Sequence, residues 1–580
     1  FIAWAFELTP DGMKKTASVE DAAGLKPLGS SDYVLIAGVV VVLGVVGFQY
    51  FGPKSEAPIV ASLEAVEADT QAPNPSDTPA TEPVDEISAD VANAPPALSV
   101  AVLPFVAMSS DPEDRYFADG LTEEILNYLA AVPELLVTSR TSAFQFRGEN
   151  LPPVPEIARQ LGVAHIVEGS IRRSGDRVRV TAQIIRAADD SHLWSQTYDR
   201  TMDDIFAIQD DIAENVTNVL DIVLDEDQRA RMGEIGVSNV EAYIAYQRGI
   251  EISLDAHQFG TDTLPDLVPA EALFAEATRL APGFSDAYMQ QADYYAHLMN
   301  RSAHNDTDEG RATLERASDR YFELLDLARD TTTDPDRRAM IGIDRVYMRD
   351  NWTGARAAIV GASQTTGCPY AAWVRELVAL SGQAESFLPY AQRIVQCDPL
   401  NVSNWKVLAD IAFYAGQFDL AYEASRSGSR LDSTDISMIV DAADALFQAD
   451  REDEMIQSMD FFQAPVPFRG YYGALFAARA GDREAAIESR LLMGEPDDDG
   501  FDEGELMLHA VLGERDAANA MVARRDDVPG YHLTLINITA RCRCGALWDL
   551  EFTPNFARRI EEADFPWPPP GADDYPLKDW

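Results

Sequence analysis

Hydrophobic and polar positions change their spacing several times along this chain. Residues 33–51 form an uncharged, largely aliphatic run of about the length that a helix needs to cross a bilayer core. Between residues 98 and 222, short apolar runs alternate with segments of helical spacing, and beyond residue 239 helical periodicity dominates. The pattern predicts a multidomain chain of the α+β and all-α classes, with a transmembrane helix, a small α/β domain and an α-solenoid of helical hairpins.

The α/β region reads as strands and helices that follow each other closely. A hairpin turn is expected at Ser174, Gly175 and Asp176, because glycine tolerates the positive φ that such turns require. The predicted strands cover residues 98–106, 135–138, 164–172, 177–187 and 191–198; the predicted helices cover residues 121–132 and 154–161 and begin again near residue 203.

The flanks of residues 33–51 predict an orientation in a membrane. Lys14, Lys15 and Lys26 precede this run, whereas Lys54 alone follows it before a long acidic stretch. By the positive-inside rule, everything after residue 51 is exported, which predicts a bacterial inner-membrane protein with its carboxyl-terminal bulk in the periplasm. A cleaved signal-like segment and a buried core helix remain as alternatives.

The segments on either side of this run differ in character. Residues 1–32 are expected to hold the end of a truncated transmembrane helix and a cytoplasmic juxtamembrane segment, with a severed amphipathic helix as the alternative. Residues 52–97 are rich in Pro, Ala and acidic side chains and lack aromatic residues, which predicts a disordered linker. The chain has a net charge of −50, so nucleic acid is not an expected partner.

Residues 240–540 fit a helical-hairpin repeat with a period of about 34 residues. Small residues stand where two helices must approach, an aromatic residue lies between them, and proline stands where the second helix stops. The pattern is carried by Ala270, Phe274, Ala277, Pro282, Tyr288, Ala292 and Tyr295, and again by Trp405, Leu408, Ala409, Gly416 and Ala421. These units resemble tetratricopeptide repeats, whose stacking forms a groove that binds a protein or peptide. The aromatic residues also suit a hydrophobic core.

Four cysteines and an aromatic tail complete the repeat region. Cys368 and Cys397 are expected near the ends of successive second helices, one repeat apart, which predicts a disulfide between them. For Cys542 and Cys544, free thiols and a strained local bridge both remain open. Residues 541–580 are expected to cap the last hairpin.

Several sequence blocks within residues 98–222 occur in an order that points to a known family. They are Ser99–Phe105, Tyr116–Glu123, Ser139–Ser142, Val167–Arg173, and His192–Trp194 followed by Tyr198–Arg200. In these blocks the chain resembles the amino-terminal domain of TolB-like proteins. The resemblance implies an α/β domain placed ahead of helical repeats and behind membrane segments, in proteins that sometimes carry class III nucleotide cyclases or winged-helix regulators.

Catalytic patterns do not stand out from the sequence. It contains no HExxH and no GxSxG, and its seven histidines are scattered. We therefore expect a non-enzymatic protein without cofactor or metal: a membrane-anchored periplasmic scaffold or sensor that binds a protein or peptide through its repeat groove. The alternative is a signal transducer whose amino-terminal cytoplasmic part, outside this sequence, carries a transcription-regulator or nucleotide-cyclase output. Self-association is left open.

Overall fold

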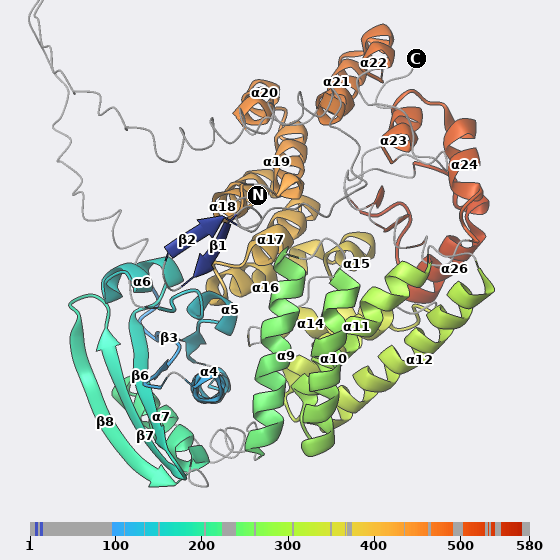
Figure 1. Ribbon diagram of the computed structural model, residues 1–580. Helices are drawn as coiled ribbons and strands as arrows, with labels where there is room; N and C mark the ends of the chain where they lie inside the picture. The colour runs from blue at the N-terminus through green and yellow to red at the C-terminus, as the bar shows by residue number, and fades with distance from the viewer. Residues whose placement is uncertain are drawn as a thin grey trace, which may run out of the picture. The chain divides into compact units, whose positions relative to one another are not determined.

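The chain was studied as a computed structural model (Figure 1). The structure describes residues 6–9, 12–15 and 95–570, with gaps at 110, 133, 149–150, 202–204, 223–238, 260–262, 304–306, 348–350, 366, 368–373, 434, 462–465, 491–502, 528–531, 533–534, 537 and 540–546. Two units are distinguished, Phe1–Asp85 and Glu86–Trp580. In the first unit, β1 (Phe6–Thr9) and β2 (Gly12–Lys15) pair as an antiparallel hairpin, where the sequence pattern predicts the end of a helix.

The expected membrane anchor is corrected. Among the described residues, no helix combines the length and the apolar character needed to cross a bilayer. The longest described helix, α12 (Asp308–Thr331), is amphipathic and carries many charged side chains, so it cannot replace a span. Residues 33–51, on which the prediction depended, lie outside the described residues. The transmembrane part of the predicted fold class and the inner-membrane, periplasmic location are therefore not retained; the described chain is mostly helical with a small mixed sheet near residues 99–201.

The mixed sheet has the strand order β5-β3-β6-β7-β8, with β4 paired to β6. Strand β3 runs parallel to both β5 and β6, whereas β6, β7 and β8 form an antiparallel meander. The hairpin between β6 and β7 turns at Gly175, whose φ is 65°, as predicted. The strands are β3 (Ser99–Val102), β4 (Val106–Ala107), β5 (Leu136–Val137), β6 (His165–Ser174), β7 (Arg177–Arg186) and β8 (Ser191–Thr201).

Helices cover both faces of this sheet. One core contains α4 (Pro112–Ala130) and α7 (Ile205–Val219) packed on side chains such as Val100, Val180 and Ile184. On the other face, α6 (Val154–Leu161) packs Ile157 and Leu161 against Ile166. The short helix α5 (Arg140–Ala143) follows β5 and is capped by the Ser139 side chain. This burial of both faces suits the continuous apolar run of β3.

Beyond residue 239, consecutive helices pair as hairpins. The first helices of the pairs are α9 (Val240–Phe259), α11 (Ser285–Ala303), α13 (Pro335–Tyr347), α15 (Val374–Ser381), α17 (Val402–Tyr414), α19 (Ile436–Gln448), α21 (Val466–Ala480) and α23 (Glu503–Val511). Their partners are α10 (Thr263–Leu280), α12, α14 (Ala355–Ser363), α16 (Ala384–Cys397), α18 (Phe418–Leu431), α20 (Glu452–Phe461), α22 (Arg483–Arg490) and α24 (Arg515–Ala523).

The residues that carry the predicted repeat pattern lie on these helices. Ala270, Phe274 and Ala277 are buried on α10, and Pro282 follows its end; Tyr288, Ala292 and Tyr295 lie on α11; Trp405, Leu408 and Ala409 lie on α17, Gly416 on the turn after it, and Ala421 on α18. Phe274 reaches the backbone of Gly249 on α9, where an added Cβ would come within 2.6 Å of its ring. The small and aromatic residues therefore serve helix packing in the described structure.

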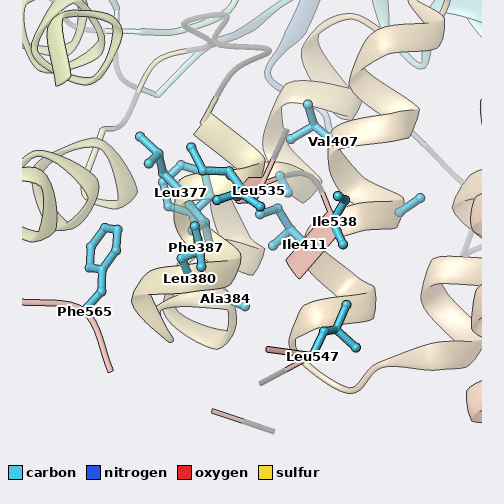
Figure 2. Packing of buried hydrophobic residues seen from close by; sticks show 14 of the residues in the cluster. Leu377, Leu380, Ala384, Phe387, Val407, Ile411, Leu535, Ile538, Leu547 and Phe565 are labelled. Carbon is cyan, nitrogen blue, oxygen red and sulfur yellow. The ribbon is translucent and has the colours of Figure 1, made fainter. Parts of the chain in front are cut away.

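A large hydrophobic core joins the later hairpins to the carboxyl-terminal segment. Figure 2 shows part of it: Leu377, Phe387, Val407 and Ile411 pack with Leu535, Ile538 and Leu547. The 3-10 helix η2 (Leu550–Phe552) leads into α26 (Pro554–Ala563). Phe556 on α26 and Phe565, two residues past its end, have rings that contact Trp352 ahead of α14. The tail thus packs against a segment about two hundred residues earlier as well as against α24.

Candidate ligand cavity at the junction of the sheet domain and the hairpins

Helix α4 joins the α/β domain to the first hairpin, because it lies against β3 and β6 on one side and against α9 on the other (Figure 1). At the crossing, the Tyr243 hydroxyl donates to the Gly120 carbonyl at 3.1 Å. A methyl group at Gly120 would come within 2.1 Å of the Tyr243 ring. Gln247, one turn further along α9, donates to the Tyr243 hydroxyl and to the Glu123 carboxylate. Glycine is therefore required here for close helix approach.

A second contact links α5 to the turn after α16. The Ser139 backbone N–H donates to the Cys397 carbonyl at 2.7 Å. The Ser142 hydroxyl donates to Asp398 Oδ1 at 2.6 Å and accepts from the Leu400 backbone N–H at 2.9 Å. Ser142 is fully buried, so these bonds replace the water it would otherwise bind.

A cavity of about 2930 Å³ opens between these two contacts. Its wall is built from α4 and α5 of the α/β domain and from α11, α12 and α13 of the second and third hairpins. The charged residues among the described lining are unbalanced, with eleven carboxylates against three arginines. They are Glu123, Glu124, Glu134, Asp286, Asp293, Asp334, Asp336, Asp344, Asp398, Asp432 and Asp435, against Arg140, Arg337 and Arg393.

Two glutamates of α4 form one end of the acidic wall. Glu123 pairs with Arg140 at 3.1 Å, yet burial raises the pKa of its carboxyl. Glu124 is only 3% exposed, and its Oε2 has no hydrogen-bond partner among the described residues. Burial and the neighbouring charges of Glu123 and Asp286 raise the pKa of Glu124 well above its usual value, and the guanidinium of Arg337 offsets this only in part.

Carboxylates of α11 and α13 also line the cavity. Asp344 on α13 lines it, and Asp344 Oδ1 has no hydrogen-bond partner among the described residues. Burial raises the pKa of Asp344 to about 7. Burial, and after it the charges of Asp344 and of Asp293 on α11, raise the pKa of the Tyr321 hydroxyl on α12. Asp293 also lies 3.8 Å from His297.

The polar residues of the Tyr116–Glu123 block lie in the middle of α4. The sequence pattern places the start of this helix near residue 121, but α4 begins at Pro112 and is capped by Asp111. Thr122 Oγ1 instead accepts from the Phe105 backbone N–H at 2.9 Å and donates to the Ala118 carbonyl. Asp119 pairs with Arg147 at 2.6 Å. Thr122 thus ties α4 to the segment between β3 and β4, and Asp119 ties it to Arg147 after α5.

One of the two cysteines of the predicted disulfide lies among the described residues. Cys397 ends α16, is 1% exposed and is disulfide-bonded. Cys368, its predicted partner, lies outside the described residues, as do Cys542 and Cys544. The pairing of Cys368 with Cys397 therefore stays a prediction.

A different acidic network lies inside the later hairpins. Glu376, Asp410 and Asp444 stand 34 residues apart on α15, α17 and α19. Arg375 pairs with Glu376 at 2.9 Å and with Asp410 at 3.0 Å, and Lys406 pairs with Asp441 at 2.5 Å. The Tyr472 hydroxyl donates to Asp444 at 2.7 Å. Cations and donors thus neutralise this network from within.

Sequence reasoning missed the cavity because its walls come from separate domains. Asp286, Asp293 and Asp344 look like ordinary polar positions of amphipathic helices, and nothing in their spacing shows that α4 faces them. One usable signal was present: Glu123 and Glu124 stand between Leu121 and Ile125 in the apolar second half of the helix, where a buried acid needs a partner. Among the described residues, no group of three or more His, Cys, Asp or Glu is arranged to hold a metal ion.

Comparison with known proteins gives one partial match that bears on function. No family model matches the chain. Over 156 residues, 26% of its length, the chain is 42% identical to "Putative adenylate cyclase 3" of Rhizobium meliloti (strain 1021). The match also covers 26% of that protein, so the chain spans about a quarter of the curated relative that it matches. Part of this chain is therefore similar to part of a protein that is named as an adenylate cyclase.

Proposed function

We propose that this chain is the ligand-controlled regulatory part of a signalling protein with a nucleotide-cyclase output. The observation that carries the proposal is the junction cavity, which is walled by helices of the α/β domain and of the hairpin array together. The partial similarity to a protein named as an adenylate cyclase supports the cyclase as the output. The TolB-like resemblance supports the same assignment.

The mechanism follows from the position of α4. This helix carries Glu123 and Glu124 to the cavity and, on its preceding turn, Gly120 to the contact with Tyr243. A ligand that binds the carboxylates changes their charge, and α4 cannot adjust without disturbing its packing on α9 or on the sheet. A ligand shifts the balance between two arrangements only by as much as it prefers one of them. The α4–α9 crossing is the element whose arrangement the ligand would bias.

The test is cyclic AMP accumulation in a cyclase-deficient bacterium that expresses the complete open reading frame. Tyr243→Phe removes the hydroxyl that bonds Gly120 but keeps the ring, and we expect it to change basal cyclic AMP severalfold by loosening the crossing, since one buried hydrogen bond contributes about 1 kcal/mol. Tyr288→Phe is the matched control, because that hydroxyl also donates to a backbone carbonyl, but its acceptor is Pro282 after α10 and not a residue of α4. Absence of cyclic AMP above the host background, or equal effects of both variants, would contradict the proposal.

Binding of a protein or peptide by the helical hairpins is a second candidate function. It is favoured by the consecutive pairing of helices from α9 to α24, which is the architecture of peptide-binding solenoids. Fold alone does not identify a partner. Recovery of a partner by residues 239–580 that does not depend on the cavity carboxylates would favour this candidate over the first.

A further inference from the structure

We propose that two copies of this chain pair through strand β8, whose residues 194–200 form an antiparallel ladder with the same residues of a second copy, centred on Thr197. The inference goes beyond the proposed function and does not depend on a cyclase output.

Strand β8 leaves one side of its backbone without a partner strand among the described residues. It is the last strand in the sheet order, and it pairs with β7 alone (Figure 1). None of the described backbone hydrogen bonds outside helices and strands involves residues 194–200. Ser195, Gln196 and Thr197 are consecutive and exposed. The outer edge of β8 therefore presents a row of backbone donors and acceptors that another strand can satisfy.

The two edges of this sheet differ in how they are protected. At one edge, β5 has only two residues, and short edge strands discourage further pairing. At the other edge, β8 has eleven residues and contains neither lysine nor proline, which commonly block such edges. Its one irregularity is a bulge at Leu193, where the register against β7 shifts. The regular stretch from Trp194 to Arg200 is therefore an unprotected edge.

Symmetry and the bulge together set the register. In a symmetric antiparallel pair, one residue faces its own counterpart at the two-fold axis, and the residues on either side of it face each other. The midpoint of the regular stretch is Thr197, so this register pairs every residue of 194–200 in both copies. Facing residues then match in chemistry, and no two like charges oppose each other. The facing pairs are Thr197 with Thr197, Gln196 with Tyr198, Ser195 with Asp199, and Trp194 with Arg200.

Side chains at the edge are available for these pairs. Arg200 is exposed and has no carboxylate partner among the described residues; its guanidinium donates to the carbonyl of the neighbouring Asp199 at 3.2 Å. Trp194 is partly buried and packs against the sheet core, so the Arg200 guanidinium of the second copy would lie against its indole. Thr197 already shares a hydroxyl–hydroxyl bond of 3.1 Å with Thr181 on β7, and the second copy would extend this row of hydroxyl groups.

A second copy is favoured over a strongly basic or strongly acidic strand by the local charge. The stretch 194–200 carries one Asp and one Arg and is locally neutral, although the whole chain has a net charge of −50. A basic strand would find no excess of acid here, and an acidic strand would find no excess of base. Repulsion between two such acidic chains opposes the pairing over longer distances, and salt screens it. The pairing should therefore strengthen as salt rises.

Sedimentation equilibrium of the purified full chain tests the pairing directly. Two short strands make an interface smaller than that of a standard stable complex, so we expect a monomer–dimer equilibrium at chain concentrations between about 1 µM and 1 mM. Its association constant should be larger in about 0.5 M than in about 0.05 M NaCl. A chain that stays monomeric over this range, or a dimer that weakens as salt rises, would overturn the inference.

Lysine at the two-fold axis should weaken the dimer. Thr197→Lys places two ammonium groups on directly facing residues, which should lower the association constant by about fivefold. Thr181→Lys is the matched control, because it removes the same hydroxyl pair with Thr197 but lies one strand further from the edge. It should leave the association constant unchanged. Equal effects of the two variants would place the interface elsewhere and overturn the inference.

A disulfide across the axis tests the register. Thr197→Cys brings two thiols to facing positions, whose Cα separation of about 4.5–5.5 Å suits a disulfide. Ser195→Cys is the matched control, because its counterpart in the same register lies four residues away, about 13 Å along the strand. Mild oxidation with diamide should give a covalent dimer on non-reducing gels for Thr197→Cys and not for Ser195→Cys, with the parent chain as the background for its own four cysteines. Equal cross-linking of the two variants would contradict the register and overturn the inference.

Discussion

Two acidic clusters in this chain differ in how their charges are balanced. In the network on α15, α17 and α19, Arg375 and Lys406 lie within ion-pair distance of Glu376, Asp410 and Asp441. Around the junction cavity, carboxylates outnumber the described arginines by eleven to three, and Glu124 Oε2 and Asp344 Oδ1 have no described hydrogen-bond partner. Glu376 Oε2 in the first cluster also has no described hydrogen-bond partner, so the clusters differ in the ratio of charges: two cations stand beside three carboxylates in the first, and three arginines stand beside eleven in the second.

The difference separates a structural use of buried charge from a binding use. Removing one member of a compensated buried pair leaves the other charge without a partner, and the fold loses stability. Carboxylates that lack counter-charge already cost stability in the unliganded chain, and a ligand can recover that cost. Neutralising one carboxylate should therefore stabilise the second cluster more than the first.

The largest effect is expected from Lys406→Met. The Lys406 ammonium group lies 2.5 Å from Asp441 and 3.9 Å from Asp410, so the substitution leaves buried carboxylates with too little positive charge. We expect a loss of about 3–5 kcal/mol in the free energy of unfolding, measured by urea denaturation followed by circular dichroism.

The double variant Lys406→Met with Asp441→Asn is the control for that loss. It removes both members of the closest pair, so it should recover part of the stability. A single variant that costs no more than Glu124→Gln at the cavity would show that the two clusters do not differ in kind.

Reduction of the Cys397 disulfide should loosen the contact between Ser139 and the end of α16. It should leave the charged network on α15, α17 and α19 unchanged. Cys397 is disulfide-bonded, and its carbonyl accepts the Ser139 N–H of the α/β domain. Reduction should cost about 2–4 kcal/mol through the unfolded state. It should also speed hydrogen exchange at Ser139 more than in α17 and α19. Cys368→Ser should reproduce the effect if the predicted pairing holds, whereas Cys542→Ser is the comparison; faster exchange confined to α17 and α19 would argue against the assignment.

Many helix and strand bounds of the α/β domain could be predicted from local sequence patterns. The helix at residues 154–161, the hairpin at Gly175 and the three long strands all have bounds close to those predicted. Periodicity and turn chemistry act over a few residues, so they can be read from one sequence. Helix α4 was placed about nine residues too late, because Pro112 at its first turn and the cap at Asp111 were not recognised as a start signal.

The parts that were missed depend on contacts between distant segments. The junction cavity requires α4 to face α11 and α13, and the tail requires Phe556 and Phe565 to reach Trp352. No local pattern encodes such pairings. The predicted membrane anchor was wrong for a different reason, because it rested on a single apolar run of sequence. No described helix is long and apolar enough to cross a bilayer. The TolB-like and tetratricopeptide resemblances and the expected partners stay predictions.

The smallest expected effect, and the most direct comparison of the clusters, is the pH dependence of Asp344→Asn. Burial raises the pKa of Asp344 to about 7 in the folded chain, well above its unfolded value, so the folded state binds the extra proton between those limits. Its contribution to stability is complete at pH 4 and is lost as the pH rises to about 7.

Asparagine resembles the protonated acid, so the variant should match the parent at pH 4. At pH 8 it should exceed the parent by about 1–3 kcal/mol, a figure reduced because the side chain is only partly buried. Urea unfolding at the two pH values measures this difference. Burial also raises the pKa of Glu376 to about 7, even with the opposing charge of Arg375 beside it. Glu376→Gln should therefore also gain stability between pH 4 and pH 8, but by less than Asp344→Asn, because it leaves the Arg375 guanidinium with Asp410 alone. A gain at Glu376 as large as the gain at Asp344 would mean that burial alone, and not the supply of counter-charge, governs the two clusters.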